Sequence, residues 1–533
     1  MTGGSTRKAD LAIIGAGASG THTLLALLKE LASGDRMRTR PLSIVIVDRD
    51  PQFFSGVAYG RRSGRASLTL STLKRFLPEE ERVPFVDWLT SHEEELTAST
   101  DIDSAWLDRH GDDIVSRRWE HLFIPRRWYG AYLAERTHAA ISQARSHGVA
   151  DVSIVNAAVT SMNLSDNRHL VRAVDCDGEA SEIDAAIVVL ALGSPPARRL
   201  PVDDAPADGL IEDIFDPGLE QTLVRLRNRL TALPKQNRRV LVVGGNAAAL
   251  EFVLAFRRGT ADLEAPITVL SPTGRPRHWR RRRGDEVAEL PDLAALRERA
   301  GAGEPVTAVE LYEAAVSDLN AAVVSGNDIA AVSDIIDAIP YFLEILGLPD
   351  RAALAARYGM AITKLLREDC GDAVDVLDHC VQTRVIDFKV GRYRRSTYSN
   401  ARFQVTATDG DGRDWILDQR FGAIVNATGF EKVSTARAPL IQQLLRDGIV
   451  EVSSSDAGLH VDSQFRAAPR LFVVGPLLAG NSNEGMLIWH AESVRRIISI
   501  AHEVAPCIAR ELGSLSSSAL LTAHLPHDVE IRT

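Results

Sequence analysis

The stretch "DLAIIGAGASGTHTLLALLKELASG", residues 10–34, decides the fold class of this chain. Its first apolar run predicts a buried strand, and after a glycine-rich turn the apolar residues recur at helical spacing. The turn holds a complete G-x-G-x-x-G pattern in Gly15, Gly17 and Gly20. In this pattern the first glycine permits the tight turn, the second lets backbone approach a pyrophosphate, and the third lets the helix pack on the strand. The stretch therefore predicts a dinucleotide site with the phosphates at the helix N-terminus.

A second buried strand, "LSIVIVDRD" at residues 42–50, completes a βαβ unit and places Asp48 at its end. A carboxylate at this position can bind ribose hydroxyls. The gap from Gly20 to Asp48 is longer than usual, and a long first helix followed by the loop "SGDRMRTRP" can absorb it. This context of strand, turn, helix, strand and Asp makes the glycine pattern much more specific than it is alone.

A second βαβ unit follows in mid-chain, with "RRVLVVGGNAAALEFVLAF" at residues 238–256 and a strand at 267–270. Gly244 takes the first position of the fingerprint and Ala249 the third, while Asn246 stands where a glycine is expected. Because Asn tolerates a positive φ better than most residues, the turn remains feasible. A crossover that binds no nucleotide is the alternative.

The remaining apolar strands and helices complete this arrangement. The strands in "AAIVVLALGSPP" and "FGAIVNATGFEK" stop at Gly193 and Gly429, respectively. Residues 285–385 have the apolar spacing of a helical insertion. A last strand and loop at residues 469–501 lead into an amphipathic helix expected to begin near Gly485. The pattern predicts an α/β fold with two dinucleotide-binding, Rossmann-like domains and a helical insertion.

Composition excludes several classes of protein. The 533 residues carry 61 Lys and Arg against 71 Asp and Glu, a net charge of −10, so a protein that coats nucleic acid is not expected. The N-terminus resembles neither a signal peptide nor an anchor, and no run of about 18 apolar residues appears. We therefore expect a cytoplasmic protein with no nucleic-acid or membrane partner, and leave open a homo-oligomer.

The cysteines and histidines indicate no metal or dithiol site. No CxxC pair exists, which excludes the dithiol–disulfide reductases and suggests a reducing compartment. His278 and His490 fall near the expected cofactor segments, but an isolated His is more often structural. The four cysteines lie far apart, at Cys176, Cys370, Cys380 and Cys507.

The two nucleotide motifs and the C-terminal return resemble the two-dinucleotide-binding-domain flavoproteins, over about residues 8 to 505. That resemblance implies FAD on the first site and NAD(P)H on the second. It implies an FAD-binding domain at 8–200, an NADPH-binding domain at 201–395 including the insertion at about 285–385, a return to the FAD-binding domain at 396–505, and a C-terminal tail at 506–533.

A narrower resemblance comes from "LTLSTLKRFLPEEERVPFVDWL", residues 68–89, which is similar to a segment of siderophore-type ornithine and lysine N-hydroxylases. Ser71, Leu73 and Lys74 keep their places in that family's pattern. The stretches "FIPRRWYGAYLAER", "NATGF" and "NEGMLIWHAES" are similar to three further family segments. The segments "FFSGVAYGRRSG" and "GPLLAG" also resemble segments of a group of bacterial FAD/NAD(P)-binding proteins. That group includes aspartate N-oxygenases that form nitrosuccinate.

These resemblances imply an FAD- and NADPH-dependent monooxygenase that N-oxygenates a small amino acid or primary amine, with O2, through a C4a-hydroperoxyflavin. The flavin supplies the chemistry, so no side chain is assigned a catalytic role and no metal is needed. Residues implied around the FAD are Gly15, Ala16, Gly17, Ala18, Ser19, Gly20, Asp48, Arg49, Thr69, Leu73, Arg126, Val159, Gly193, Gly475, Gly485 and Met486.

The implied substrate residues are Lys74, Arg75 and Asn483. In the ornithine and lysine hydroxylases the residue matching Lys74 holds the substrate α-carboxylate. The chain departs from the family at Thr69, where Gln is usual, which puts a flavin contact in doubt, and at Arg75, where Asp is usual. A second cation beside Lys74 suits a second carboxylate, so aspartate, giving N-hydroxyaspartate or nitrosuccinate, is the leading specific substrate. Surface charges on a loop are the alternative for both cations.

The arginine run "RPRHWRRRRGD", residues 275–285, follows the second strand of the second unit. NADP-specific enzymes place Arg there to bind the ribose 2′-phosphate, and Ser271 stands where an NAD enzyme has Asp or Glu. Arg280 to Arg283 are left to a dicarboxylic substrate, to the acidic insertion, or to solvent. The implied NADPH residues are Gly244, Asn246, Ala247, Ala248, Ser271, Arg275, Arg277 and Gly429.

Two other functions stay open. One is a single-component flavin monooxygenase that oxidises carbon or sulfur. The other is a non-oxygenating flavoprotein that acts as a reductase or passes electrons to a protein partner.

Overall fold

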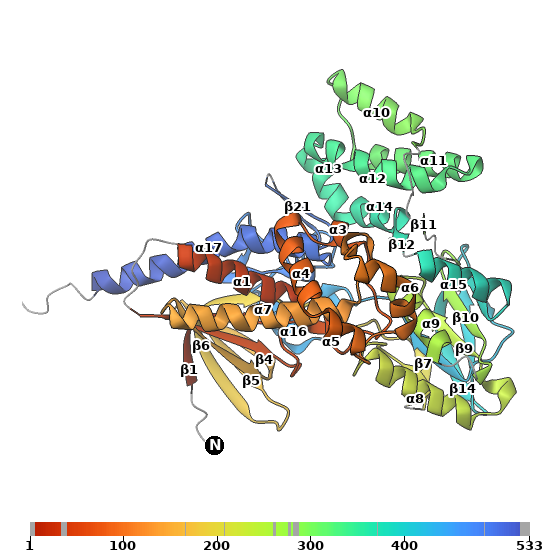
Figure 1. Ribbon diagram of the computed structural model, residues 1–533, viewed down its shortest axis with the longest axis horizontal. Helices are drawn as coiled ribbons and strands as arrows, with labels where there is room; N and C mark the ends of the chain where they lie inside the picture. Colours follow the sequence, from red (N-terminus) through yellow and green to blue (C-terminus); the bar gives the residue numbers. More distant parts are fainter. Residues whose placement is uncertain are drawn as a thin grey trace, which may run out of the picture.

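The computed structural model (Figure 1) contains a mixed sheet with a parallel centre and a second, fully parallel sheet, each with its helices, and a helical insertion beside the second sheet. This arrangement confirms the predicted α/β class with two Rossmann-like domains. The described residues are 6–33, 40–165, 167–206, 208–259, 263–275, 279–280, 287–369, 371–483 and 485–522.

The first sheet is built around β1 (Thr6–Ile14), which pairs in parallel with β2 (Leu42–Asp48) and β6 (Ala180–Leu190). Near-continuous apolar runs suit strands that are buried on both faces. The other strands are β3 (Ala150–Asn156), β4 (Ala158–Ser165), β5 (Arg168–Val174), β18 (Arg466–Ala468) and β19 (Leu471–Val473). The order is β18-β19-β6-β1-β2-β3, and the antiparallel pair β4–β5 joins the sheet through β6.

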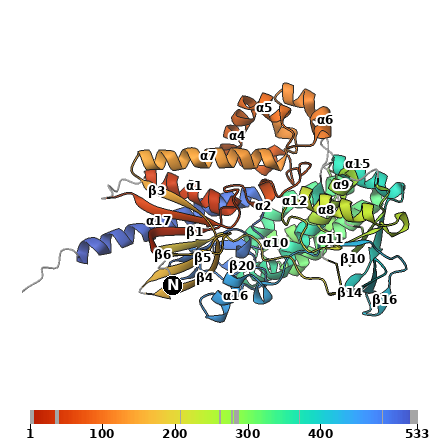
Figure 2. The same cartoon turned by 90° about the horizontal axis from the view of Figure 1, so that it is seen from below.

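Three long helices cover this sheet (Figure 2): α1 (Ala18–Ser33), α7 (Arg126–Ser146) and α17 (Val494–Thr522). Leu24, Ile141 and Val504, one from each helix, belong to the apolar core of the domain. The last helix begins at Val494 and not near Gly485, because β20 (Asn481–Asn483) and β21 (Met486–Ile488) pair there as antiparallel strands. It also continues beyond 506, the expected start of the tail, with Ile508 buried.

Between β2 and α7 the chain forms short helices that enclose an aromatic cluster. Phe85, Trp119 and Tyr129 are its largest fully buried side chains. The elements are α2 (Gly56–Tyr59), α3 (Leu73–Phe76), α4 (Glu79–Ser91), α5 (Glu93–Ala98), α6 (Ser104–Val115) and a turn at Trp119–His121.

The second sheet is fully parallel, and its strand order is β13-β10-β9-β17-β8. Its strands are β8 (Leu210–Ile211), β9 (Val240–Val243), β10 (Ile267–Ser271), β13 (Ile386–Val390) and β17 (Ala423–Asn426). Its helices are α8 (Leu219–Ala232), α9 (Ala247–Gly259) and α15 (Gly371–Gln382), with a short turn at Lys235–Asn237. A smaller sheet joins β7 (Val202–Asp203), β14 (Arg392–Ser399), β15 (Arg402–Thr408) and β16 (Asp414–Ile416).

The chain stays in the second domain beyond residue 396, the boundary expected from the sequence. Strand β17 lies between β9 and β8, and all four of its residues are buried there. The chain then contributes Val433 and Leu440 to the core of the first domain, before β18 and β19 complete the first sheet. The intervening elements are a turn at Val433–Thr435, α16 (Pro439–Arg446) and, after β19, a turn at Gly475–Leu478.

The helical insertion has its own apolar core and occupies most of the predicted range. Helix α11 begins with a capping box of Thr307 and Glu310 and ends at Gly326, which has a φ of 78°. The elements are β11 (Trp279–Arg280), α10 (Pro291–Gly301), α11 (Ala308–Ser325), α12 (Asp328–Ile345), α13 (Leu348–Ala353), a π-helical segment at Leu354–Tyr358, α14 (Gly359–Leu365) and β12 (Glu368–Asp369). Within the described residues, every helix is too short or too polar to span a bilayer.

Candidate functional site

The first glycine turn closes where β1 meets its neighbours β2 and β6. Gly15 has a φ of 109°, and a Cβ there would lie 2.2 Å from the carbonyl oxygen of Ala191. The Gly15 N–H donates to the carbonyl of Val47 at 2.8 Å. A Cβ on Gly20 would meet the Gly15 oxygen at 2.0 Å, so helix α1 packs directly on the turn. Only glycine fits at these two positions, as the dinucleotide pattern requires.

A loop after β2 covers this turn, and the sequence reasoning assigned no site residue to it. The Phe54 N–H donates to the Ala16 carbonyl at 2.8 Å, and Phe54 itself has a φ of 72°. A Cβ on Gly56 would lie 2.9 Å from the Cα of Gly17. A left-handed phenylalanine is uncommon and marks a backbone held by its surroundings. The glycine in "FFSG" was the available signal for this close approach.

Asp48 faces the same turn from the end of β2. One carboxylate oxygen accepts the Ala16 N–H at 2.6 Å, and the other accepts the Asp50 N–H at 2.8 Å. Burial raises the pKa of Asp48 above its ordinary value, although these two hydrogen bonds oppose the rise. The side chain keeps part of its surface accessible, as an acceptor of a ribose hydroxyl requires. Its neighbour Arg49 is exposed.

The C-terminal return and the start of β4 also reach this turn. A Cβ on Gly475, whose φ is 77°, would lie 2.5 Å from the Ser19 hydroxyl, so this loop lies against the first turn of α1. The Ala157 N–H donates to the Asp48 carbonyl at 2.9 Å, which places β4, with half-buried Val159, beside the end of β2.

The other predicted flavin residues of these segments have different surroundings. Gly193 has a φ of 74°, and among the described atoms none lies within 4 Å of an added Cβ. Met486 is buried in the core, whereas Gly485 is exposed and donates its N–H to the Asn483 side chain at 3.1 Å. Asn483 is thereby placed in the β20–β21 hairpin.

The predicted substrate segment is held against the start of α7. The Thr69 hydroxyl accepts the Ile124 N–H at 3.0 Å and donates to the Ser71 carbonyl at 2.8 Å. Leu73 is fully buried in the aromatic cluster, which also contains Val494 at the start of α17. This anchoring leaves Lys74 exposed and Arg75 partly exposed on α3.

The second glycine turn repeats the first at the end of β9. Gly244 has a φ of 114°, and a Cβ there would lie 2.1 Å from the Ala427 oxygen. Asn246 does not take the positive φ that the sequence suggested. Its side-chain oxygen accepts the Ala249 N–H at 3.0 Å and so caps helix α9, a role in which Asn is preferred. Gly429, with a φ of 89°, lies opposite Asn246. A Cβ added to Gly429 would lie 3.9 Å from the side-chain amide nitrogen of Asn246.

The second turn also exposes two of its predicted nucleotide residues. Ala247 and Ala248 begin α9 and are both partly exposed. Their backbone N–H groups lie at a helix N-terminus, where a phosphate is favoured.

The strand-end residues of the second turn are engaged with protein groups. Ser271 is 1% exposed, and its hydroxyl donates to the Gly274 carbonyl at 2.7 Å. Arg275 forms an ion pair with Asp378 of α15. Arg277 and His278, like Arg281 to Arg283, lie outside the described residues. Strand β11 pairs with β12 in a register that sets Arg280 opposite Asp369, so the backbone of the arginine run joins the acidic end of the insertion.

A cleft separates the substrate segment of the first domain from one face of α9. Arg126 lies in it, where its guanidinium donates to the Leu68 carbonyl at 2.7 Å and to Glu251 at 3.1 Å. The lining residues are Ala66, Ser67, Leu68, Thr69, Leu70, Ala105, Trp106, Arg109, Arg126, Ala247, Leu250, Glu251, Leu254, Ala255, Arg258 and Arg367. The cleft therefore runs between the start of the second turn's helix and Thr69 of the first domain.

The helical insertion docks on the first domain beside the C-terminal hairpin. A Cβ on Gly359 would lie 2.4 Å from the Trp489 ring, and the Trp489 indole donates to the Thr363 hydroxyl at 3.0 Å. The Arg496 guanidinium stacks on this ring, 4.4 Å from its centre. Burial, with a smaller effect from Arg496, lowers the pKa of His490 to about 4, so this histidine is neutral near pH 7.

Comparison with known proteins agrees with this architecture. Residues 12–195, which include the first glycine turn, match the family model described as FAD-NAD(P)-binding. An uncharacterized protein of Mycobacterium tuberculosis is 29% identical over an alignment of 524 residues that covers 96% of this chain and 96% of its own.

Two solved structures share the fold over almost their whole length. An ornithine N-hydroxylase from Kutzneria sp. 744 has a TM-score of 0.54 at 17% identity and covers 94% of this chain and 99% of its own. L-lysine 6-monooxygenase from Pseudomonas syringae has a TM-score of 0.53 at 16% identity, with the same two coverages. At these identities the likeness shows the fold, and the resemblance to the N-hydroxylases is confirmed at that level.

Proposed function

We propose that the protein is an FAD- and NADPH-dependent monooxygenase that N-oxygenates a small amino acid or primary amine. The observation that carries this proposal is the repetition of one glycine turn in both sheets, each with a carbonyl oxygen about where a Cβ would be. Two such turns, one in each sheet, are suited to two dinucleotides. The shared fold of the ornithine and lysine oxygenases supports the same reaction class.

The residues present fit both cofactors. At the first turn, the glycine pattern is the one that lets backbone approach a pyrophosphate, and Asp48 offers a carboxylate for a ribose hydroxyl. At the second turn, Gly244 and the start of α9 offer the same cradle. Ser271 carries no charge, so it does not repel a 2′-phosphate as an acidic residue would. Arg275 would have to exchange Asp378 for that phosphate.

The reaction balances with one oxygen molecule. One amine, one O2, one NADPH and one proton give one hydroxylamine, one water and one NADP⁺. Bound FAD supplies the oxygen chemistry once NADPH has reduced it. The chain has to hold both cofactors, exclude water and orient a neutral amine toward the flavin.

An acidic amino acid, with aspartate first, is our proposed substrate. Lys74 is exposed on α3 while its neighbour Leu73 is fixed in the core, so the ammonium group can meet a carboxylate of the substrate. Arg75 adds a second cation next to it. Two adjacent cations suit the two carboxylates of aspartate better than the single carboxylate and distal ammonium of ornithine or lysine.

The proposal is tested with FAD-loaded protein, NADPH, oxygen and a panel of aspartate, glutamate, ornithine, lysine and simple amines. We expect NADPH oxidation to be coupled to an N-oxygenated product, with aspartate the best substrate. If aspartate yields only hydrogen peroxide while another amine is oxygenated, the acidic substrate is wrong and the reaction class stands. If no amine is oxygenated and the oxidation stays uncoupled, the monooxygenase proposal fails.

Lys74→Ala is the variant that tests the substrate site. We expect the KM for the amino acid to rise by about tenfold or more, the cost of losing one charged hydrogen bond, while flavin reduction by NADPH is unchanged. Lys29→Ala, which removes an exposed lysine from α1, is the matched control. Loss of FAD from the Lys74 variant would show that this residue belongs to the cofactor site.

A further inference from the structure

Two adjacent arginines at the start of α7 reach across to the second domain, each to a different helix. Arg126 pairs with Glu251 of α9 at 3.1 Å, and Arg127 pairs with Glu220 of α8 at 2.8 Å. Three of the four side chains are 13–14% exposed, and Glu220 is 31% exposed. Charge-assisted pairs that are this well shielded are stronger than pairs on an open surface.

The same two glutamates also hold the loop that precedes the substrate segment. The Ser67 hydroxyl donates to Glu251, and the Arg65 N–H donates to Glu220. Each glutamate therefore binds the first domain twice, once through an arginine of α7 and once through the loop.

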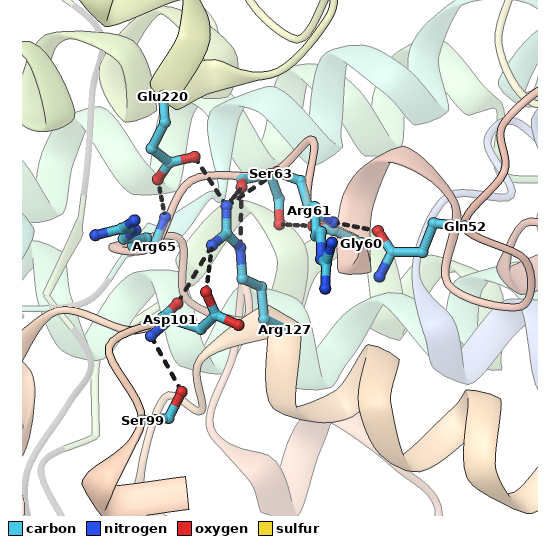
Figure 3. Close-up of polar contacts among 9 residues, drawn as sticks. All are labelled: Gln52, Gly60, Arg61, Ser63, Arg65, Ser99, Asp101, Arg127 and Glu220. Atoms are coloured by element: carbon cyan, nitrogen blue, oxygen red, sulfur yellow. Dashed lines mark hydrogen bonds and ion pairs between the residues drawn. The ribbon is translucent and has the colours of Figure 1, made fainter.

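Arg127 is the centre of this arrangement (Figure 3). Its guanidinium donates to the carbonyl oxygens of Ser63 at 2.6 Å and Arg61 at 2.9 Å, besides the pair with Glu220. Its other terminal nitrogen lies 3.9 Å from the Asp101 carboxylate. The loop, helix α7 and the second domain are thus joined through one planar group, which lysine could not replace.

The bound elements lead directly to the two predicted cofactor sites. Glu251 lies about one helical turn from Ala247, at the second glycine turn. Ser67 is two residues from Thr69 and leads to α3 with Lys74. The far end of α9 is held as well, because Arg258 pairs with Asp103.

We infer that the pairs Arg126–Glu251 and Arg127–Glu220, here called the arginine clamp, are positioning residues for hydride transfer between the two cofactors. The inference rests on the proposed function. Hydride transfer needs the nicotinamide to approach the flavin within contact distance, and a misplacement of 1 Å can cost about 100-fold in rate. The clamp fixes the second domain, through α8 and α9, against the loop that leads to Thr69 and the predicted flavin and substrate segment.

The test variant is Glu220→Gln with Glu251→Gln in the full-length, FAD-loaded protein. Glutamine keeps the side-chain length and can still accept from Ser67 and Arg65, but it carries no charge for the arginines. We expect the limiting rate of flavin reduction at saturating NADPH to fall by about tenfold or more, while the dissociation constant for NADPH stays unchanged. Reduction by dithionite and the FAD content should also be unchanged, since neither depends on the second domain.

Glu264→Gln is the matched control, because Glu264 also lies in the second domain and pairs with Lys235 on an exposed surface. It should leave every rate unchanged. If the double variant is unstable, Glu220→Gln alone is used, since Glu220 is the most exposed member of the clamp. Arg127→Lys should be reduced slowly as well, because lysine keeps the charge and loses the planar set of donors.

A limiting reduction rate that is unchanged or faster in the glutamine variant would overturn the inference. A wild-type protein that NADPH does not reduce would instead contradict the proposed function. In that case hydrogen exchange decides the clamp: faster exchange at residues 60–67 in the variant supports it as an orienting device, and unchanged exchange overturns it.

Discussion

The first and second glycine turns have the same backbone geometry and different side chains around it. In both turns, the residue directly after a neighbouring parallel strand blocks the Cβ position of the glycine with its carbonyl oxygen. Ala191 follows β6, and its oxygen lies 2.2 Å from a Cβ added to Gly15; Ala427 follows β17, and its oxygen lies 2.1 Å from a Cβ added to Gly244. In both turns, the glycine N–H donates to a carbonyl of the other neighbouring strand: Gly15 to Val47 of β2 at 2.8 Å, and Gly244 to Leu270 of β10 at 2.9 Å. The requirement for glycine is therefore set by three converging strands in each sheet.

The side chains separate the two sites. The first turn has glycine at its second position and ends with Asp48, a carboxylate that faces the turn. The second has Asn246, which caps α9, and ends with Ser271, whose hydroxyl is buried and bonded to its own loop. The two turns thus share one backbone geometry and differ in the strand-end side chain and the helix cap, which we propose distinguish the two nucleotides.

The largest effect should come from Gly15→Ala. The new Cβ would overlap the Ala191 carbonyl and take a φ of 109°, a combined cost of several kcal/mol that the turn cannot relieve without moving β6. We expect the purified variant to retain almost no FAD, as measured by the visible flavin absorbance of the protein, and to have a lower melting temperature. A fully loaded Gly15→Ala protein would show that the first turn does not bind the flavin.

Gly244→Ala is the matching change in the second turn and should have a narrower effect. Its Cβ would overlap the Ala427 carbonyl by the same amount, but the first sheet is untouched. FAD should remain bound and be reduced by dithionite, whereas reduction by NADPH should be nearly abolished in stopped-flow measurements. Equal loss of FAD in both variants would mean that the two turns do not serve separate nucleotides.

Asp48→Asn should weaken FAD binding by about tenfold, the cost of one charge-assisted hydrogen bond. Because burial raises the pKa of Asp48, its carboxylate takes up a proton at a higher pH than an ordinary Asp as the solution is acidified. FAD release from the wild type should begin in that pH range, and the Asn variant should lack this step. Fluorescence of released FAD during an acid titration measures both effects, and identical curves would contradict the role.

The smallest effect should come from Asn246→Ala. It removes the cap of α9 at a cost of about 1 kcal/mol and frees the Ala249 N–H at the second turn. We expect a slightly lower melting temperature and a change of only a few-fold in the dissociation constant for NADPH, with FAD binding unaffected. A large loss of NADPH binding would assign the Asn246 side chain to the nucleotide instead of the helix.

Local sequence was sufficient for the features that local conformation determines. Gly15 and Gly244 could be predicted as turn residues, and Asp48 as the end of the next strand, because a tight turn between strand and helix dictates residue type within a few positions. Phe54 could not, because its left-handed backbone depends on a hydrogen bond to Ala16 across the turn. Which of the two sheets β17 joins could not be predicted either, because an apolar run looks the same in the sequence whichever sheet it enters.

Charged pairs between distant residues were the other limit. Arg126 and Glu251 are separated by 125 residues, and nothing in either segment indicates the other. Arg275 occupies the expected position after β10, but Asp378 of α15 is its partner, which only the packing of that helix could reveal. The sequence shows which charged residues exist, but it does not show which of them form ion pairs.

The strand order of the first sheet has a consequence for the way this protein is made on the ribosome. Strand β6 is complete when residue 190 has been synthesised, yet Val188 to Leu190 pair with Leu471 to Val473. While the 280 residues between Leu190 and Leu471 are translated, that apolar edge has no permanent neighbour, and an open edge strand invites pairing with other chains. The N-terminal domain is therefore the first to begin folding and among the last to finish. A chain that stops before β19 should accumulate as an aggregate even though both glycine turns are intact.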